Sequence, residues 1–281
     1  MANLGSAICR VQMQRMEPVF DRPAVRLHRD RAAATVHHVA PILTEAAERL
    51  LDRLDDTTRR FTRALDVGGR GVVAPLLRAR GLHVVSADLS ARMAALSGPP
   101  AVVADEEWLP FAPGAFDLVV ANLSLHWVND LPGTLIQLRR ALTPDGLLLA
   151  SVPALGTLQE LRQALTTAEA TLTGGAAPRV SPFPELRDMA SLMQRAGFVL
   201  PVADAEEIVL AYANPLALLR DLRDAGEANA TTLRSRRFVQ GALFAQALSG
   251  LPTQDDRAGV TLRIATVTGW AGPQAPPTKG T

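Results

Sequence analysis

The segment from Ala64 to Val73, which reads ALDVGGRGVV, constrains the fold more than any other part of the chain. A short apolar run ends in Asp66, glycines follow at once, and an apolar segment containing alanine and leucine comes next. This order predicts a strand, a tight nucleotide-binding turn and a helix. Glycine suits such a turn because it adopts positive φ angles and lets a ligand approach the backbone closely.

Strand and helix patterns alternate after this turn. We predict strands at about 63–67, 82–88, 101–104, 116–121 and 147–152, with helices between them at about 73–80, 90–97 and 134–142. Such alternation indicates a parallel sheet with right-handed crossovers, which binds ligands outside the carboxyl ends of its strands. The glycine turn, Asp88, Asp105 and the loop at 122–130 all fall at such ends.

The second half of the chain is less regular. Its patterns predict helices at about 158–172, 186–195, 215–223 and 234–248, and strands at 206–212 and 260–269. We expect the last strand to complete the sheet and residues 213–250 to form a helical lid.

The N-terminal part is expected to be a helical extension. An amphipathic pattern spans 42–60, and Arg22, Arg26 and Arg29 would share one face of a helix within 17–36. That arginine face is either solvated or a gate over the nucleotide pocket. We predict one domain over 17–271, a disordered or over-annotated start at 1–16 and a disordered tail at 272–281.

Composition restricts the function classes. A net charge of +1 over 281 residues argues against a general nucleic-acid binder. Cys9 is the only cysteine, which excludes an intramolecular disulfide and a multi-cysteine metal site. The histidines lack metal-ligand spacing, so we expect no metal.

No apolar run is long enough to span a membrane. We expect a cytoplasmic protein, or a mitochondrial one if the arginine-containing residues 1–16 are a transit peptide.

Two nucleotides compete for the glycine turn. Residues 69–74 fit the G-x-G-x-x-A pattern of dinucleotide binding, and Asp88 lies near the position expected for a ribose-binding acid. However, the Asp66 carboxylate directly precedes the glycines, where it would repel a pyrophosphate. A carboxylate suits S-adenosylmethionine better, because that cofactor carries a sulfonium, an ammonium group and ribose hydroxyls.

The motifs ALDVGGRG, VVSADLS, VADEEWLPFAPGAFDLVVANLSLHW and LTPDGLLL together resemble the class I S-adenosylmethionine-dependent methyltransferases. The resemblance implies an α/β, Rossmann-like fold, with a mostly parallel seven-stranded sheet, helices on both faces and an α-helical lid. It also implies the cofactor contacts: Asp88 with the ribose, Asp105 with the adenine amino group, Asp66, Gly68 and Gly69 with the methionine part, and the adjoining Leu89, Glu106 and Asn122. The chain departs from the family pattern where Arg70 and Val72 replace glycines in an ungapped alignment.

A narrower resemblance extends over most of the chain. The segments VFDRPAVRLHRDRAAA, LHWVNDLPG, PRVSPFPELRDMASLMQRAGFVLPVAD and YANPLALLRDLRDAGEANA are similar to bacterial relatives of mitochondrial complex I assembly factor five. A more distant likeness is to the malonyl-acyl-carrier-protein methyltransferase of biotin synthesis. These resemblances imply a small-molecule or carrier-protein substrate, or a respiratory complex I subunit. They leave open methyl transfer, arginine hydroxylation as understood for the eukaryotic factor, and cofactor binding without catalysis.

Few residues are needed for methyl transfer beyond those that position the acceptor, because the activated methyl group resides on the cofactor. His126 is the candidate general base, since histidine titrates near neutrality; the alternative is that it only shapes the pocket. Trp127 would stack on the substrate or pack in the core. Arg179, in a loop framed by glycine and proline, would bind a substrate carboxylate. Trp108 would flank the adenine or remain an exposed anchor.

Overall fold

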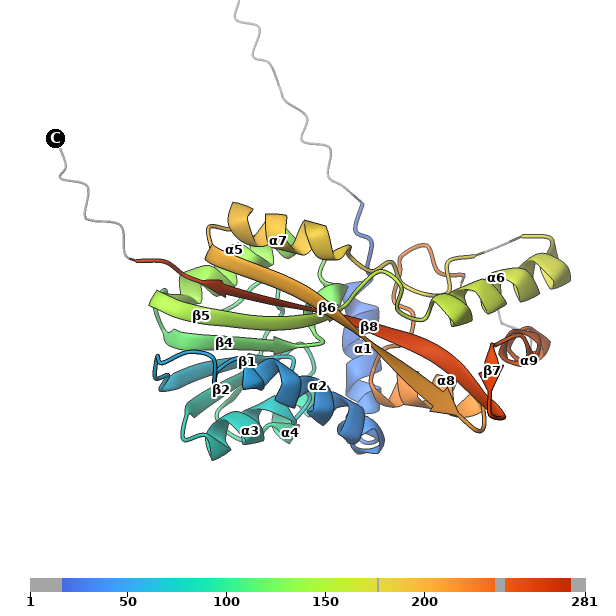
Figure 1. Cartoon of the computed structure of the whole chain (residues 1–281), viewed down its shortest axis with the longest axis horizontal. Helices are drawn as coiled ribbons and strands as arrows, with labels where there is room; N and C mark the ends of the chain where they lie inside the picture. The colour runs from blue at the N-terminus through green and yellow to red at the C-terminus, as the bar shows by residue number, and fades with distance from the viewer. Residues whose placement is uncertain (1–16, 176, 236–240, 274–281) are drawn as a thin grey trace, which may run out of the picture.

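The computed structural model describes residues 17–175, 177–235 and 241–273. Its sheet has the order β3-β2-β1-β4-β5-β8-β6, with β7 paired to β8 at one end (Figure 1). The strands are β1 Arg63–Val67, β2 His83–Asp88, β3 Ala101–Val103, β4 Phe116–Asn122, β5 Leu142–Pro153, β6 Val199–Tyr212, β7 Thr253–Gln254 and β8 Arg257–Trp270. The strands from β3 to β5 run parallel, whereas β8 is antiparallel to both β5 and β6. The α/β, Rossmann-like and mostly parallel architecture predicted from the sequence is confirmed.

Helices cover both faces of this sheet (Figure 1). The helices are α1 Arg22–Ala32, α2 Ala40–Asp52, α3 Val73–Ala79, α4 Ala91–Leu96, α5 Leu131–Ala141, α6 Gln159–Thr173, α7 Leu186–Arg195, α8 Leu216–Asp224 and α9 Gly241–Ser249, with 3-10 turns η1 Val36–Val39 and η2 Leu125–Trp127. One face buries Leu138 of α5 and Met193 of α7, and the other buries Leu50 of α2 and Leu77 of α3. No described helix is both long and apolar enough to cross a membrane.

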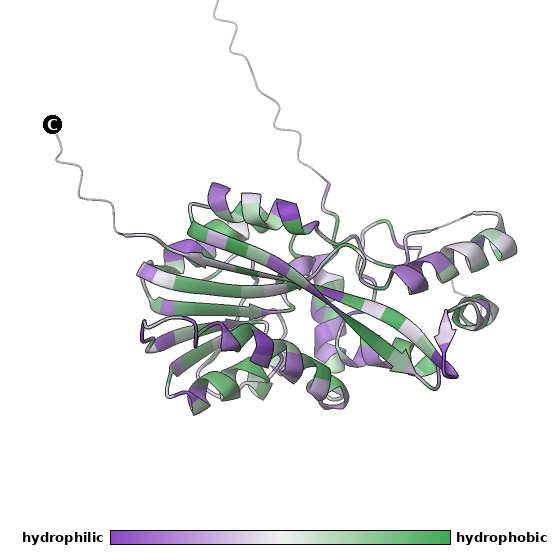
Figure 2. Cartoon of the chain, in the orientation of Figure 1, coloured by the Kyte–Doolittle hydropathy of each residue, from purple (hydrophilic) through white to green (hydrophobic). Residues whose placement is uncertain are grey.

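The central strands are apolar on both sides, as parallel strands between two helical layers must be. Residues 118–121 of β4 and 147–150 of β5 are all buried. Figure 2 shows these strands coloured mostly as hydrophobic, while polar residues lie on the outer helices. The rigid core therefore fixes the strand ends at which the predicted site residues lie.

The β6–β8 ribbon extends beyond the rest of the sheet. Pairing of β5 with β8 stops at Pro153 and Ile264, whereas β6 pairs with β8 as far as Tyr212 and Ala258. Helices α6, α8 and α9 gather at this projecting end and share a separate apolar cluster with β8 (Figure 1). This part of the molecule contains the predicted lid region.

Several boundaries differ from the sequence-based expectations. Strand β6 begins at Val199 and not at 206, because its first half is defined by pairing with β8 and carries no apolar alternation. Helix α2 ends at Asp52 and not at 60, and the expected helix over 17–36 is confined to α1. Of the expected helix at 234–248, the structure describes α9, which begins at Gly241, while residues 236–240 lie outside the described residues. Residues 1–16, and most of the predicted disordered tail, lie outside the described residues.

Candidate active site

The glycine turn after β1 adopts an unusual backbone. Gly68, Arg70 and Gly71 have φ angles of 66°, 51° and 79°, so Arg70 takes a left-handed conformation that side-chain-bearing residues rarely adopt. A Cβ added to Gly69 would lie 2.1 Å from Asp66 Oδ1. The turn therefore tolerates arginine in place of a glycine at position 70, but it requires glycine at 69.

Asp66 lies beneath this turn and is fully buried. Its Oδ2 accepts a hydrogen bond from the Ser86 hydroxyl at 3.3 Å, while Oδ1 has no hydrogen-bond partner among the described residues. Burial raises the pKa of Asp66 to about 7. The Asp66 carboxyl group therefore lies against the glycine turn, and it gains or loses its proton near neutral pH.

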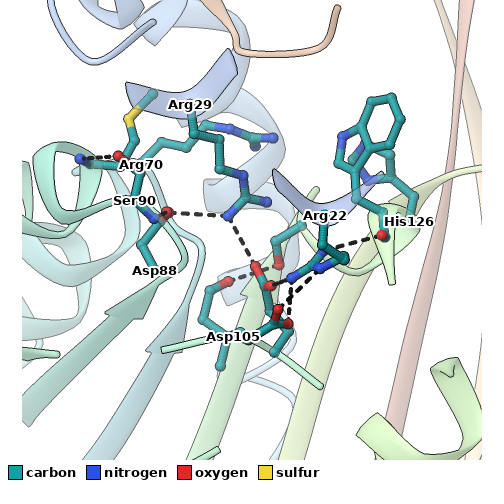
Figure 3. Close-up of polar contacts among 12 residues, drawn as sticks. Arg22, Arg29, Arg70, Asp88, Ser90, Asp105 and His126 are labelled. Carbon is teal, nitrogen blue, oxygen red and sulfur yellow. Dashed lines mark hydrogen bonds and ion pairs between the residues drawn. The ribbon is translucent and has the colours of Figure 1, made fainter. Parts of the chain in front are cut away.

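Asp88, at the carboxyl end of β2, is ion-paired with Arg29 of α1. Arg29 Nη1 lies 3.2 Å from Asp88 Oδ2 and 3.0 Å from Glu106 Oε1, and all three side chains are buried (Figure 3). Asp88 Oδ1 also accepts the Ser90 backbone N–H at 2.8 Å. Burial raises the pKa of Asp88 although Arg29 opposes the shift, whereas for Glu106 the nearby Arg29 and Arg22 outweigh burial and lower the pKa.

Asp105 and Glu106, which follow β3, also bind Arg22 from the start of α1 (Figure 3). Arg22 Nη2 donates to Asp105 Oδ1 at 2.6 Å and contacts Glu106 as well, and its Nη1 donates to the Trp127 carbonyl oxygen at 3.1 Å. Of the three arginines predicted to share a face, Arg22 and Arg29 reach the site, whereas Arg26 is mainly exposed. The gate interpretation of this helix face thus fits two of its three arginines.

A second buried network centres on Glu227, in the loop after α8. Glu227 Oε2 lies 2.7 Å from both His126 Nε2 and Trp127 Nε1, and Oε1 is ion-paired with Arg70 of the glycine turn. Burial would raise the pKa of Glu227, but His126 and Arg70 together lower it to about 2. A charged Glu227 therefore ties the glycine turn to the loop after β4.

The remaining predicted residues lie in different settings. Leu89 packs near Trp127 beneath α1. Both polar atoms of the Asn122 side chain are hydrogen-bonded within the protein, to the Leu43 carbonyl oxygen and the Ser151 hydroxyl. Trp108 is 80% exposed and touches no neighbouring ring within the described residues. The cofactor roles assigned to Leu89 and Asn122 stay predictions.

Arg179 lies away from the carboxylates of the strand ends. It is held by Glu169 of α6, with Nη2 at 2.5 Å from Oε1. Arg179 still borders a cavity that also reaches Arg70, Trp127 and Glu227. Within the described residues, no group of three or more His, Cys, Asp and Glu side chains is arranged to hold a metal ion.

A comparison with family models decides the family. The model described as a methyltransferase domain matches residues 36–201, more than half of the chain. The chain belongs to the methyltransferase domain family. It is an S-adenosylmethionine-dependent methyltransferase by family and by fold.

Curated relatives match most of the chain. It is 34% identical to the mitochondrial arginine-hydroxylase NDUFAF5 of Danio rerio, over 90% of this chain and 82% of that protein. It is 38% identical to the malonyl-[acyl-carrier protein] O-methyltransferase of Laribacter hongkongensis, over 78% of each. A solved S-adenosylmethionine-dependent methyltransferase from Thermotoga maritima shares the fold, with a TM-score of 0.51 and 14% identity over 88% of this chain and 99% of that one.

The residues at the strand ends fit the cofactor of this family. Its ribose hydroxyls need acceptors, which Asp88 offers at the end of β2. Its methionine carboxylate needs a donor, and Arg29 Nη2 is buried with no hydrogen-bond partner in the described part of the chain. Arg29 also lies over the glycine turn, since a Cβ on Gly68 would be 3.2 Å from its Nη1. The carboxyl groups of Asp88 and Asp66, together with the Arg29 guanidinium, therefore match the charge pattern of S-adenosylmethionine.

The sequence alone gives no specific role to Arg29 or Glu227. Arg29 follows from the sequence only as part of an arginine face of a helix, and no motif contains Glu227 as a site residue. No local sequence pattern identifies Glu227, because its partners Arg70 and His126 are more than 100 residues away along the chain.

Proposed function

We propose that the protein transfers the methyl group of S-adenosylmethionine to an acid, presented as a small molecule or bound to a carrier protein. The observation that carries the proposal is a cavity of about 380 Å³ whose wall includes Arg70, Trp127 and Glu227. Arg70 belongs to the glycine turn, so the cofactor turn and the cavity share a residue. Relatives named as malonyl-[acyl-carrier protein] O-methyltransferases support an acid as the acceptor.

His126 is proposed as the general base. A carboxylate only accepts hydrogen bonds, so the 2.7 Å contact with Glu227 places a proton on His126 Nε2. In the neutral imidazole, Nδ1 is then the basic nitrogen, and it has no hydrogen-bond partner among the described residues. An acid that enters an apolar cavity retains its proton more strongly than in water. His126 does not itself line the cavity, whereas its partner Glu227 does, so proton transfer to His126 Nδ1 would require the acceptor to reach behind this part of the wall.

The other residues bind and orient. Asp88 and Arg29 would hold the cofactor, which would supply the activated methyl group when bound. Trp127, fixed through its indole N–H to Glu227, presents an apolar surface to the acceptor. Arg70 is buried and Glu227 is partly buried at the junction between the two sites.

Label transfer tests this proposal. The protein is incubated with S-adenosylmethionine tritiated in the methyl group and malonyl-acyl carrier protein, and the label is followed by release as volatile methanol after base treatment. We expect base-labile label in the acceptor, which is diagnostic of a methyl ester. Bound cofactor without any label in the acceptor would contradict the proposal.

A second candidate is the binding or hydroxylation of an arginine in a respiratory complex I subunit. The carboxylates beside the glycine turn already hold arginine side chains of this chain, Glu106 with Arg29 and Glu227 with Arg70, so a further arginine would have to compete with them. Relatives named arginine-hydroxylase NDUFAF5 support this candidate. Recovery of a complex I subunit on the immobilised protein, with no methyl label in carrier-bound acids, would favour this candidate.

The proposed reaction on a carrier-bound acid would take place in the cytoplasm. A mitochondrial site would apply if residues 1–16 direct import, but these residues lie outside the described part of the chain.

A further inference from the structure

The cavity beside the site continues far from the glycine turn. It runs between the projecting β6–β8 ribbon and helices α6, α8 and α9, which lie together at one end of the molecule in Figure 1. Its apolar wall includes Leu161 and Leu165 of α6, Leu219 and Leu222 of α8, Leu210 of β6 and Phe244 of α9. The cavity is therefore built largely by the projecting end of the β6–β8 ribbon and the helices around it.

The size of this space indicates a ligand site. Protein interiors leave few voids larger than a water molecule, whose share of liquid volume is about 30 Å³. A cavity of about 380 Å³ lies within the range of small-molecule sites. A flexible chain on the order of ten heavy atoms would fill it, if each atom takes about the volume of one water.

The charged residues around the cavity favour a ligand whose inner portion is apolar. Of the four arginines that line it, three are already paired within the chain: Arg70 with Glu227, Arg179 with Glu169, and Arg234 with Asp21. The fourth, Arg223, has no ion pair within the described residues and is exposed. A second anionic group deep in the cavity would have to compete with these carboxylates. The rest of the wall offers mainly leucine and aromatic side chains.

We propose that the cavity between α6, α8 and α9 binds an extended apolar chain of the methyl acceptor, with its acid end near Arg70, Trp127 and Glu227. The inference rests on the proposed function, because it identifies the substrate class of the same site. The acceptor is then a free acid, or a carrier thioester that keeps a free carboxyl group at its other end, with a chain of about eight to twelve carbons, longer than a malonyl group. Buried methylene groups supply its affinity, at about fourfold per carbon until the cavity is full.

Calorimetry with hexanoate, octanoate, decanoate and dodecanoate, in the presence of S-adenosylhomocysteine, tests the proposal. We expect the affinity to rise about fourfold per added methylene and to level off near ten carbons. Leu219→Trp, which fills the cavity, is expected to move this limit to shorter chains. Leu216→Trp is the matched control, because Leu216 lies on the same helix, is half exposed and does not line the cavity. If Leu219→Trp does not fold, Phe244→Ala should extend the limit to longer chains.

An affinity that does not change with chain length, or that Leu219→Trp and Phe244→Ala leave unchanged, would overturn the inference. Parallel methyl-transfer assays separate it from the proposed function. Length-dependent binding without methyl transfer would uphold the apolar site and contradict the proposed reaction. Equal methylation of malonyl thioesters and ten-carbon dicarboxylic thioesters would uphold the reaction and contradict the apolar site.

Discussion

Arg29 Nη1 lies 3.2 Å from Asp88 Oδ2, and both side chains are buried although they belong to elements 59 residues apart in sequence. This ion pair joins α1 to the end of β2, where we propose that the cofactor binds. Arg29 also pairs with Glu106, which Arg22 contacts as well, so two guanidinium groups of α1 face the two buried carboxylates. The N-terminal helix thus lies over the strand ends and the glycine turn of the proposed cofactor site.

Arg29→Met should destabilise the protein by about 3–5 kcal/mol, because it leaves Asp88 buried without its cation. Urea unfolding followed by circular dichroism measures this change. Arg26→Met is the control, since Arg26 lies on the same helix with a mainly exposed side chain and makes only a 4.0 Å pair with Asp30. Equal stabilities for the two variants would show that the buried pair contributes nothing specific.

Burial of Asp66 should make the free energy of unfolding fall as the pH rises. Its pKa is about 7 in the folded protein against 3.8 ordinarily, so the folded state binds the proton more tightly. The stability contributed by protonated Asp66 is complete below about pH 4 and is lost as pH rises through about 7, by up to about 4 kcal/mol. Unfolding free energies of the wild type and Asp66→Asn at several pH values measure this difference. A difference between the two proteins that stays constant from pH 4 to pH 8 would refute the buried titration.

His126→Gln should lower kcat for methyl transfer by about 10²–10⁴-fold if His126 acts as the general base. The cofactor affinity should change little, because His126 bonds to Glu227 and not to Asp88 or Arg29. The pH profile of kcat distinguishes a base from a residue that only shapes the pocket. A wild-type profile that loses activity at low pH, and a variant profile that does not, would support the base; identical profiles would remove His126 from the mechanism.

The sheet was predictable because its signals are local. The glycine turn after β1 and the apolar runs of β4 and β5 each carry their pattern within a few residues. The first half of β6 was not predictable, because residues 199–205 are only partly buried and owe their conformation to pairing with β8. Tertiary pairing decides such segments, and propensity does not.

The candidate site was predictable only in part. Asp88 and Asp105 follow directly from their places at the ends of β2 and β3. The burial of Arg29 and the role of Glu227 depend on how α1 and the loop after α8 fold over those ends, which spacing along the chain does not encode. The sequence pattern of α1 was compatible with a solvated arginine face, and only the packing against the strand ends makes Arg29 part of the site.

Titration of the full-length protein with S-adenosylmethionine, repeated with Asp88→Asn and with Asp117→Asn as a surface control, tests the central claim most directly. Asp117 accepts hydrogen bonds from Thr62 at the opposite end of the strands. We expect binding by the wild type and the control, and an affinity lowered about 10- to 100-fold in Asp88→Asn, since hydrogen bonds to a charged acceptor are worth about 1.5–3 kcal/mol. Equal affinities for all three folded proteins would contradict the assignment of Asp88, and no binding to the folded wild type would contradict the cofactor site as a whole.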